Sequence, residues 1–297
     1  MDLIHIEVDD PPEGLDPLGL LVPIPPNMLH QRLISFSHSD HLSPTRSRAD
    51  DSEQQALFLS GREGAKAHFE FRFGKPHGKR PAEHFRPAVN RYVVASPELV
   101  AGIAQLTEGA SGNRDKLLRI VGFAASLFDY DHPPVKFYEG KDAIPLLREL
   151  TKGSCLDINT FLMSSLYVAG IPAAYYSGYF FATGKPPTQD HFHCWVSTFT
   201  DGEQQDWDIA HHIMAGTREV HPGLNPKPGI RFAMSCGRGL KFRLADRDVW
   251  ISHLGYPVWV RRDGGHDKAK AVATLIKSGE FHDLDKRVPR EGTEVRI

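Results

Sequence analysis

The alternation of apolar and polar residues divides the chain into a β-rich first third, a helical block and a second β-rich region. An alternation with a period of two is typical of half-buried strands. In the first third it occurs in residues 1–8, 56–59 and 68–73. The proline-rich residues 20–28 are typical of turns, and the polar residues 37–54 predict a loop. We therefore expect a β-rich domain over residues 1–95.

The spacing of apolar residues becomes helical at Ser96-Pro97, where the serine is a suitable N-cap and the proline suits the first helical position. Helices are predicted over residues 97–106, 114–127 and 141–150. The strand period returns at Ala173. It predicts strands over residues 173–181, 191–199, 204–209, 231–232, 241–244 and 249–252.

This order of elements is that of an α+β protein, because consecutive strands follow the helices instead of alternating with them. We expect a core domain over residues 96–262. The remaining residues 263–297 are charged and only weakly periodic, and they are expected to form a C-terminal tail.

Composition and charge exclude several classes of protein. A formal net charge of -2 argues against a protein that binds duplex nucleic acid. The 3 cysteines cannot all pair and form no CxxC motif, so we expect reduced thiols. The first residues are acidic where a signal peptide is basic, and no apolar run approaches the roughly 18 residues of a membrane span. We expect a cytoplasmic protein without a nucleic-acid or membrane partner.

The predicted helix that begins near residue 155 has a cysteine at its first position. Ser154 and Asp157 form a capping-box pattern, and Gly170 and Pro172 are typical of a helix end. Cys155 then lies at the positive end of the helix dipole, which lowers the pKa of a thiol. Asp157 opposes this effect, so the thiolate would need a cationic partner. The alternative is that Cys155 is a small buried hydrophobic residue.

A cationic partner is expected from the hairpin that follows. Asp201-Gly202 predicts a two-residue turn between two strands. If the pairing continues from this turn, His193 and Asp208 become diagonal neighbours on one face. The underlying cross-strand pairs are His193 with Ala210 and Trp195 with Asp208. A carboxylate there would orient the imidazole and favour its protonated form, which leaves the other ring nitrogen for a nucleophile. A solvated hairpin with incidental polar residues is the alternative.

The sequence resembles the transglutaminase-like superfamily over residues 96–252. The resemblance rests on five motifs: Gly153-Ser-Cys155, Gly170-Ile-Pro172, Tyr176-Ser-Gly178-Tyr179, His193-Cys-Trp195-Val196 and Trp207-Asp208. It implies that Cys155 is a nucleophile, His193 a base and acid, and Asp208 the group that orients His193. It also implies a papain-like α+β core in which the cysteine helix packs on an antiparallel sheet. The N-terminal part looks like the β domain of bacterial members.

Other residues near these motifs are less certain to belong to the site than Cys155, His193 and Asp208. Tyr130 and Trp195 are candidates to line the site or to donate a hydrogen bond to an oxyanion, although Tyr130 would also suit a half-buried core position. Cys194 is expected to point away from His193 and to pack as a small side chain. His211 is expected to face solvent, and Cys236 has no evident partner.

The hypothesis is a cysteine-dependent acyl-transfer enzyme without a cofactor. It would cleave an amide bond in a peptide, a protein or a small molecule through a thioester intermediate. Transfer of the acyl group to an amine uses the same residues and is the first alternative. A metal-dependent enzyme that uses a face of His191, His193 and His212 is the second. A non-catalytic binding module is the third, and the intact Cys–His–Asp set argues against it.

Overall fold

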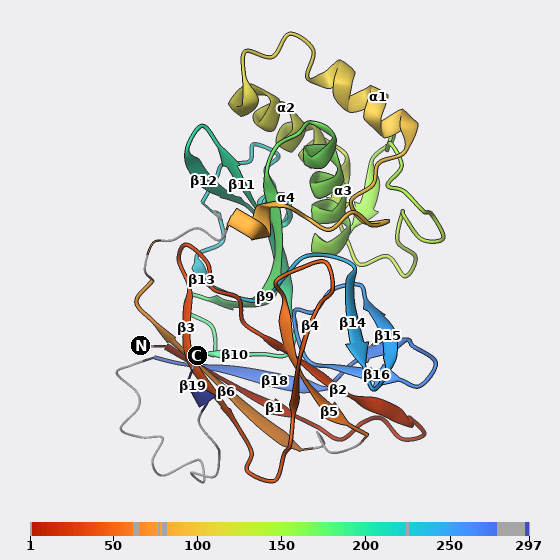
Figure 1. Cartoon of the computed structure of the whole chain (residues 1–297). Coiled ribbons are helices and arrows are strands. Elements are labelled where there is room, and N and C mark those ends of the chain that lie inside the picture. The colour runs from red at the N-terminus through yellow and green to blue at the C-terminus, as the bar shows by residue number, and fades with distance from the viewer. Residues whose placement is uncertain are drawn as a thin grey trace.

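A four-stranded antiparallel sheet lies between the helices and the rest of the molecule (Figure 1). This computed structural model describes residues 2–61, 66–76, 78, 82–223, 226–277 and 295–296. The order of the strands is β12-β11-β9-β13. Their bounds are Glu203–Trp207 for β12, His193–Thr200 for β11, Ala173–Ala182 for β9 and Gly229–Cys236 for β13. The α+β class expected from the sequence is confirmed.

The helices gather at one end of this sheet (Figure 1). They are α1 (Pro97–Leu106), α2 (Asn113–Ser126), α3 (Cys155–Val168) and α4 (Ile209–Met214). The start of α1 is capped as expected, since Ser96 Oγ accepts a hydrogen bond from Leu99 N–H at 3.3 Å. A short parallel pair, β7 (Phe128–Tyr130) and β8 (Thr151–Gly153), leads into α3.

The predicted helix over residues 141–150 is wrong. Ile144 instead forms an isolated parallel bridge with Ala95, and its N–H donates to the carbonyl of Val94 at 2.8 Å. The backbone of this segment is therefore committed to an extended pairing beside the start of α1. That long-range contact overrides a short run of helical spacing.

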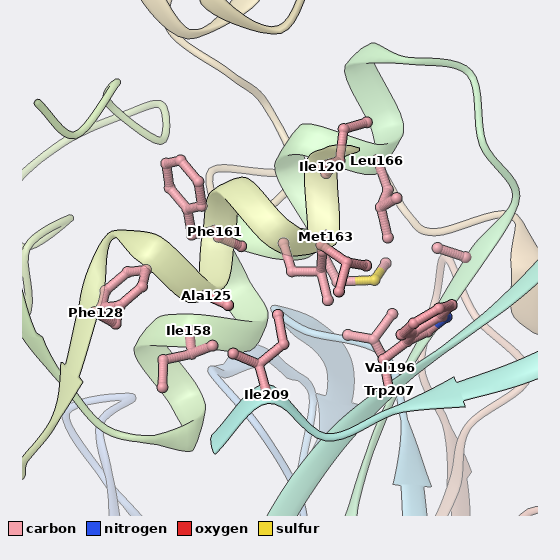
Figure 2. Close-up of a cluster of buried hydrophobic side chains, with 14 of the residues drawn as sticks. Ile120, Ala125, Phe128, Ile158, Phe161, Met163, Leu166, Val196, Trp207 and Ile209 are labelled. Atoms are coloured by element: carbon pink, nitrogen blue, oxygen red, sulfur yellow. The ribbon is translucent and has the colours of Figure 1, made fainter. Parts of the chain in front are cut away.

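The core under the helices is apolar and continuous. Figure 2 shows α2 and α3 meeting over side chains from β11, β12 and α4. Among its fully buried members are Ile120, Ile158, Phe161, Leu166, Val196, Trp207 and Ile209. Helix α3 is buried along nearly its whole length, so its first residue is held rigidly against the sheet.

Two further sheets form the part of the molecule opposite the helices (Figure 1). The six-stranded sheet has the order β10-β18-β1-β6-β3-β19, and the five-stranded sheet has the order β17-β16-β2-β5-β4. The strands from the first third of the chain are β1 (Asp2–Val8), β2 (Pro17–Ile24), β3 (Arg32–His38), β4 (Thr45–Arg48), β5 (Gln55–Ser60) and β6 (Ala67–Gly74). The single-turn helix η1 (Ala82–Phe85) follows them.

The prediction for residues 20–28 is partly wrong. Residues 20–24 belong to β2, all of whose residues are buried because Leu20 and Val22 pack in one apolar cluster and Leu21 packs in another on the opposite face. A strand covered on both faces has no alternation of polar residues, so a period of two cannot reveal it. Strands β3 and β4 were also missed, and β4 lies inside the predicted loop over residues 37–54.

The expected C-terminal tail over residues 263–297 is also corrected where the structure describes it. Strand β17 (His266–Lys268) pairs with β16 (Val258–Arg261), and β18 (Ala271–Ile276) pairs with β1 over six residue pairs. The two-residue strands β10 (Thr188–Gln189) and β19 (Val295–Arg296) join the same six-stranded sheet. Residues 278–294 and 297 lie outside the described residues.

The hairpin of β14 (Leu240–Leu244) and β15 (Arg247–Ile251) completes the described fold. Aromatic residues of β9 and β13, among them Tyr179, Phe181 and Phe232, pack in the same cluster as the strands of the first third. The β-rich part and the core therefore share apolar surface. No helix in the described part of the chain is long and apolar enough to cross a membrane.

Candidate active site

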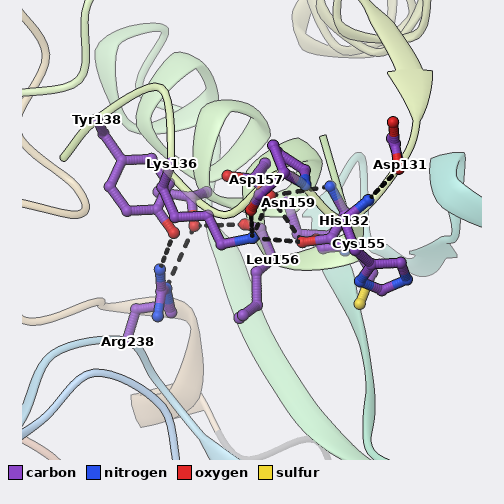
Figure 3. Close-up of polar contacts among 12 residues, drawn as sticks. Asp131, His132, Lys136, Tyr138, Cys155, Leu156, Asp157, Asn159 and Arg238 are labelled. Carbon is purple, nitrogen blue, oxygen red and sulfur yellow. Dashed lines mark hydrogen bonds and ion pairs between the residues drawn. The ribbon is translucent and has the colours of Figure 1, made fainter. Parts of the chain in front are cut away.

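Cys155 is the first residue of α3, as the sequence predicts. The helix start is fixed by Asp157, whose Oδ2 accepts hydrogen bonds from the N–H of Ser154 at 2.9 Å and from its hydroxyl at 2.6 Å. Lys136 Nζ lies 3.2 Å from the same carboxylate oxygen (Figure 3). Lys136 therefore balances the negative charge that would otherwise oppose a thiolate at Cys155.

The residue before the cap has to be glycine. A Cβ at Gly153 would lie 2.7 Å from Cδ1 of Phe128 and 2.9 Å from Cβ of Asp157, which is closer than side chains can approach. The glycine of the Gly-x-Cys motif therefore lets β8 run directly into α3.

Asn159 links the first turn of α3 to the sheet. Its Nδ2 donates to the carbonyl of Cys155 at 2.9 Å and to the carbonyl of Cys194 at 3.0 Å. Both bonds are buried, where a hydrogen bond to a fixed partner is costly to break. The position of Cys155 relative to β11 is therefore fixed by a side chain that the sequence analysis did not single out.

His193 and Asp208 are in contact, but not as cross-strand neighbours. The turn at Asp201-Gly202 is as predicted, and the register runs from Thr200 with Glu203 to Val196 with Trp207. Strand β12 ends there, so the expected pairs of His193 with Ala210 and Trp195 with Asp208 do not form. Asp208 instead caps α4, and its Oδ2 lies 2.7 Å from Nε2 of His193.

The charged forms of Cys155, His193 and Asp208 stabilise one another. A hydrogen bond with Cys194 lowers the pKa of the Cys155 thiol, burial opposes this, and His193 lowers it again, so that the pKa falls well below the ordinary value. Burial disfavours a charged imidazole, but Asp208 and the thiol raise the pKa of His193 to about 9. Burial also disfavours a charged Asp208, yet His193 and His211 hold the pKa of its carboxyl well below the ordinary value. The arrangement can therefore hold a thiolate beside an imidazolium.

Tyr130 lies at the edge of the group formed by Cys155, His193 and Asp208, whereas Trp195 lies in a different apolar cluster. Tyr130 is opposite Gly153 in the β7–β8 pair, and burial followed by the nearby Cys155 raises the pKa of its hydroxyl. Trp195 packs with Tyr176 in a separate apolar cluster on the other face of β11 from Cys194. The indole therefore does not belong to the apolar cluster that contains Cys155.

Cys194 packs as a small buried side chain, as expected, but it lies in the cluster of Cys155 and interacts with its thiol. Burial, and then the neighbouring Cys155, raises the pKa of the Cys194 thiol well above its ordinary value. Cys236 is buried as well, in the same cluster as Trp195, and burial raises the pKa of its thiol.

The expectation that His211 faces solvent is wrong. Its side chain is only 4 % exposed, and its ring stacks on that of His193 with 4.1 Å between centroids. The error follows from the missed helix α4, which turns His211 inward. An N-cap aspartate before the apolar residues Ile209-Ala210 is the signal that could have revealed this helix. Arg231, which contacts both Asp208 and His211, lies on β13 and was not singled out either.

The metal-binding face of His191, His193 and His212 does not form. His191 is 79 % exposed beside Asp190. Both ring nitrogens of His212 face the backbone, with Nδ1 2.8 Å from the carbonyl of Asp208 and Nε2 3.1 Å from the N–H of His221. These nitrogens are engaged in fixing α4 and the segment after it.

Two other groups of potential ligands occur among the described residues, namely His5, Glu7 and His68 on the β-rich part and His193, Asp208 and His211 here. In the second group the guanidinium of Arg231 lies 2.8 Å from the shared carboxylate oxygen. A metal ion would have to compete with this permanent cation, so the group fits a proton-bearing network better than a metal centre.

Comparison with known proteins identifies the region that carries these residues. Residues 101–209 match the family model described as the transglutaminase-like superfamily. No curated protein matches the sequence. Among solved structures, a protein from Cytophaga hutchinsonii provisionally assigned as a cysteine protease aligns with 12 % identity over 93 % of this chain and 97 % of that chain, with a TM-score of 0.48. The periplasmic domain of TgpA from Pseudomonas aeruginosa aligns with 13 % identity over 72 % of this chain and 88 % of that chain, with a TM-score of 0.39.

The matched region begins in α1 and ends at the first residue of α4, and it contains Cys155, His193 and Asp208. Over residues 101–209, the chain is therefore similar to the transglutaminase-like superfamily.

Proposed function

We propose that this protein is a cysteine-dependent acyl-transfer enzyme that hydrolyses amide bonds in peptides or proteins. One observation carries the proposal. Asp208 holds Nε2 of His193 at 2.7 Å, which leaves Nδ1 for the thiol of Cys155, and the pKa values of thiol and imidazole shift in opposite directions. Such a pair is the usual activated nucleophile of cysteine enzymes.

In the first half of the reaction the thiolate of Cys155 attacks the carbonyl carbon of the amide. The C–N bond then breaks, and the imidazolium of His193 gives its proton to the departing amine. The product is a thioester on Cys155. In the second half, neutral His193 takes a proton from water, which attacks the thioester and releases the acid and the thiolate.

The oxyanion that forms during each attack needs hydrogen-bond donors. The backbone N–H groups at the start of α3, next to Cys155, supply one. The hydroxyl of Tyr130 is the proposed second donor. Its raised pKa supports this role, because the phenol keeps its proton at any pH at which the thiolate is the nucleophile.

Hydrolysis is proposed rather than transfer to an amine because water needs no acceptor site of its own. The test uses a mixture of peptides whose amino groups have been chemically blocked. Hydrolysis creates free amino groups, which are counted by labelling and located by mass spectrometry. A biotinylated primary amine in a parallel reaction reports transfer.

Wild-type protein is expected to create free amino groups and to show an acyl adduct on Cys155 when the reaction is quenched with acid. Cys155→Ala should abolish both signals. Cys236→Ala is the matched control, because it removes another buried thiol from outside the site, and it should keep both. Cleavage by Cys155→Ala at the wild-type rate would rule out the proposed nucleophile, and incorporation of biotin instead of cleavage would assign the protein to amine transfer.

A further inference from the structure

Three side chains converge on a single oxygen of Asp208. Oδ2 lies 2.7 Å from Nε2 of His193, 2.8 Å from Nη2 of Arg231 and 2.9 Å from Nδ1 of His211. All are buried, with the Arg231 side chain 6 % exposed. Neither Arg231 nor His211 is needed for the simple Cys–His–Asp arrangement, so their presence at its carboxylate calls for an explanation.

Arg231 and Asp208 both contact Nδ1 of His211. Arg231 is always protonated and can only donate, and its Nη2 is 2.8 Å from Nδ1 of His211. The same Nδ1 lies 2.9 Å from Oδ2 of Asp208, so His211 is held between a permanent donor and a carboxylate. Burial is the main cause that lowers the pKa of His211; the positive charges of His193 and Arg231 add to it, and Asp208 opposes them. His211 is therefore neutral.

The ring of His211 also fixes the plane of His193. The two rings are 4.1 Å apart and inclined by only 4°. Phe180 contacts His211 with 4.8 Å between centroids, and the guanidinium of Arg231 lies 4.4 Å from the centre of the Phe180 ring. The imidazole that faces the thiol thus rests on a second imidazole, which is itself held by Arg231 and Phe180.

We propose that His211 and Arg231 are positioning residues that act through Asp208 and His193 to set the protonation state of the thiol–imidazole pair at Cys155. The inference rests on the proposed function only in taking Cys155 as the reactive thiol. His211 keeps the His193 ring in the plane that faces the thiol. Arg231 orders Asp208 and His211 and adds a permanent positive charge to the pair.

Several other groups also face the pair. They are Tyr130 on β7, Tyr175 on β9 and Cys194 on β11, in addition to Asp208 and His211 on α4 and Arg231 on β13. Lys227 lies further out, with Nζ 5.4 Å from the centre of the Phe180 ring. The tyrosines and Cys194 have raised pKa values and are neutral near pH 7. Arg231 is therefore the permanent cation in direct contact with the carboxylate that orients His193.

The sign of the effect follows from the charge. Removing a cation disfavours the thiolate of Cys155 and favours the imidazolium of His193, so both pKa values rise. The range of pH in which thiolate and imidazolium coexist then moves upward. Loss of the His211 ring frees His193 to turn away from the thiol, which also returns the pKa of Cys155 toward the ordinary value of about 8.5.

The experiment measures the rate of alkylation of Cys155 by iodoacetamide between pH 4 and 10, in the full chain and without any substrate. The acid limb of this profile reports the pKa of the Cys155 thiol, and Arg231→Gln is expected to move it upward by about one pH unit. At pH values below the limb, alkylation should then be about tenfold slower. Arg231→Lys keeps the charge and should recover most of the shift. Arg262→Gln is the matched control, because it removes the same charge from an exposed pair with Asp16.

The role of the ring is tested by two substitutions at one position. His211→Gln keeps a side chain that can hydrogen-bond with Arg231 and Asp208 but removes the stacked ring, and it should move the acid limb upward. His211→Phe keeps a ring over His193 and should shift the limb by less than His211→Gln does. Circular dichroism and the Tm of each variant show whether it is folded.

Profiles of folded Arg231→Gln and His211→Gln that coincide with the wild-type profile would overturn the proposal. If Arg231→Gln does not fold, equal profiles for His211→Gln and His211→Phe overturn it. Failure of the proposed function looks different, since wild-type Cys155 itself would then titrate as an ordinary thiol, near about pH 8.5.

Discussion

At the scale of single residues, the surroundings of three identical side chains give them different chemistry. Cys155, Cys194 and Cys236 are all buried. The hydrogen bond with Cys194 and the charge of His193 lower the pKa of Cys155, whereas burial raises the pKa values of the other two thiols. Burial alone makes a thiol inert, so the reactive cysteine is identified by its partners.

The first prediction is selective alkylation. With iodoacetamide at pH 6.5, Cys155 is expected to react at least about tenfold faster than Cys194 or Cys236, because only its thiolate is populated at that pH. Peptide mapping of briefly treated native protein measures the three rates. Protein unfolded in guanidinium is the control, and there the three cysteines should react alike. Equal labelling in the native protein would contradict a nucleophilic Cys155.

The second prediction concerns Asp208→Asn. Asparagine is as good an N-cap as aspartate, so α4 should persist, but the amide cannot stabilise an imidazolium. Turnover of the cleaved peptides should fall by about 10–10³-fold, and by more for His193→Ala. The two substitutions should be strongly non-additive because the residues act as one unit. A double variant that shows the product of the two single losses would mean that they act independently.

The third prediction is the pH dependence of kcat/KM. His193 must be protonated to release the amine, and its raised pKa means that this form is present below about 9 and is lost as the pH rises through that value. The acid limb should lie well below the pH at which a free thiol ionises, because the pKa of Cys155 is lowered. Asp208→Asn should bring the alkaline limb to lower pH. An alkaline limb that does not move would show that Asp208 does not raise the pKa of His193.

At the scale of elements, strand β9 holds the site together. Gly178 lies opposite His193 on β11 and opposite Ala233 on β13, next to an irregularity in the register. A Cβ at Gly178 would lie 2.0 Å from the carbonyl oxygen of Phe232 and 2.7 Å from the backbone nitrogen of Met234. These are backbone atoms that cannot move without breaking the pairing of β9 with β13, and β13 carries Arg231.

The fourth prediction follows from this close approach. Gly178→Ala should lower the free energy of unfolding by about 1–3 kcal/mol, as overpacking usually does, and should impair the site with it. Gly122→Ala is the matched control, since Gly122 lies inside α2 with nothing within 4 Å of its Cβ position. That change should stabilise the protein by about 0.5–1 kcal/mol. Denaturant titration measures the free energy of unfolding of both variants. If Gly178→Ala has the same free energy of unfolding as the wild type, β9 and β13 can move apart locally without a loss of stability.

At the scale of the whole molecule, the two ends of the chain build one sheet. Strand β1 lies between β6 and β18, so the first strand is completed by one from near the C-terminus. Ala271, Ala273 and Leu275 of β18 pack in the apolar cluster that also contains Tyr179 of β9. The β-rich part is therefore not a unit of the first third alone.

The fifth prediction is that deletion of residues 263–297 destabilises the β-rich part. The deletion leaves an edge of β1 unpaired and uncovers apolar side chains, which favours aggregation. We expect a lower Tm and loss of soluble protein. Deletion of residues 278–297 keeps β18 and is the control, with a smaller effect expected. If both deletions behave alike, β18 is not what completes the sheet.

The sequence alone determined the features whose signals are local. The cap at Ser154, the cysteine at the first helical position and the hairpin at Asp201-Gly202 each depend on residues within a few positions of one another. Such contacts cost little chain entropy to form, so short patterns encode them reliably. The pairing of His193 with Asp208 was also expected, although the cap of α4 makes the contact instead of a continued strand.

Only the tertiary structure decided what depends on contacts between distant segments. Arg231 reaches Asp208 from β13, Cys194 approaches Cys155 from β11, Asn159 links α3 to β11, and β18 joins β1. The same amino acids would be ordinary surface or core residues elsewhere. What gives them a role is burial next to particular partners, because only where water is excluded does one neighbouring charge or donor change the pKa of a side chain this strongly.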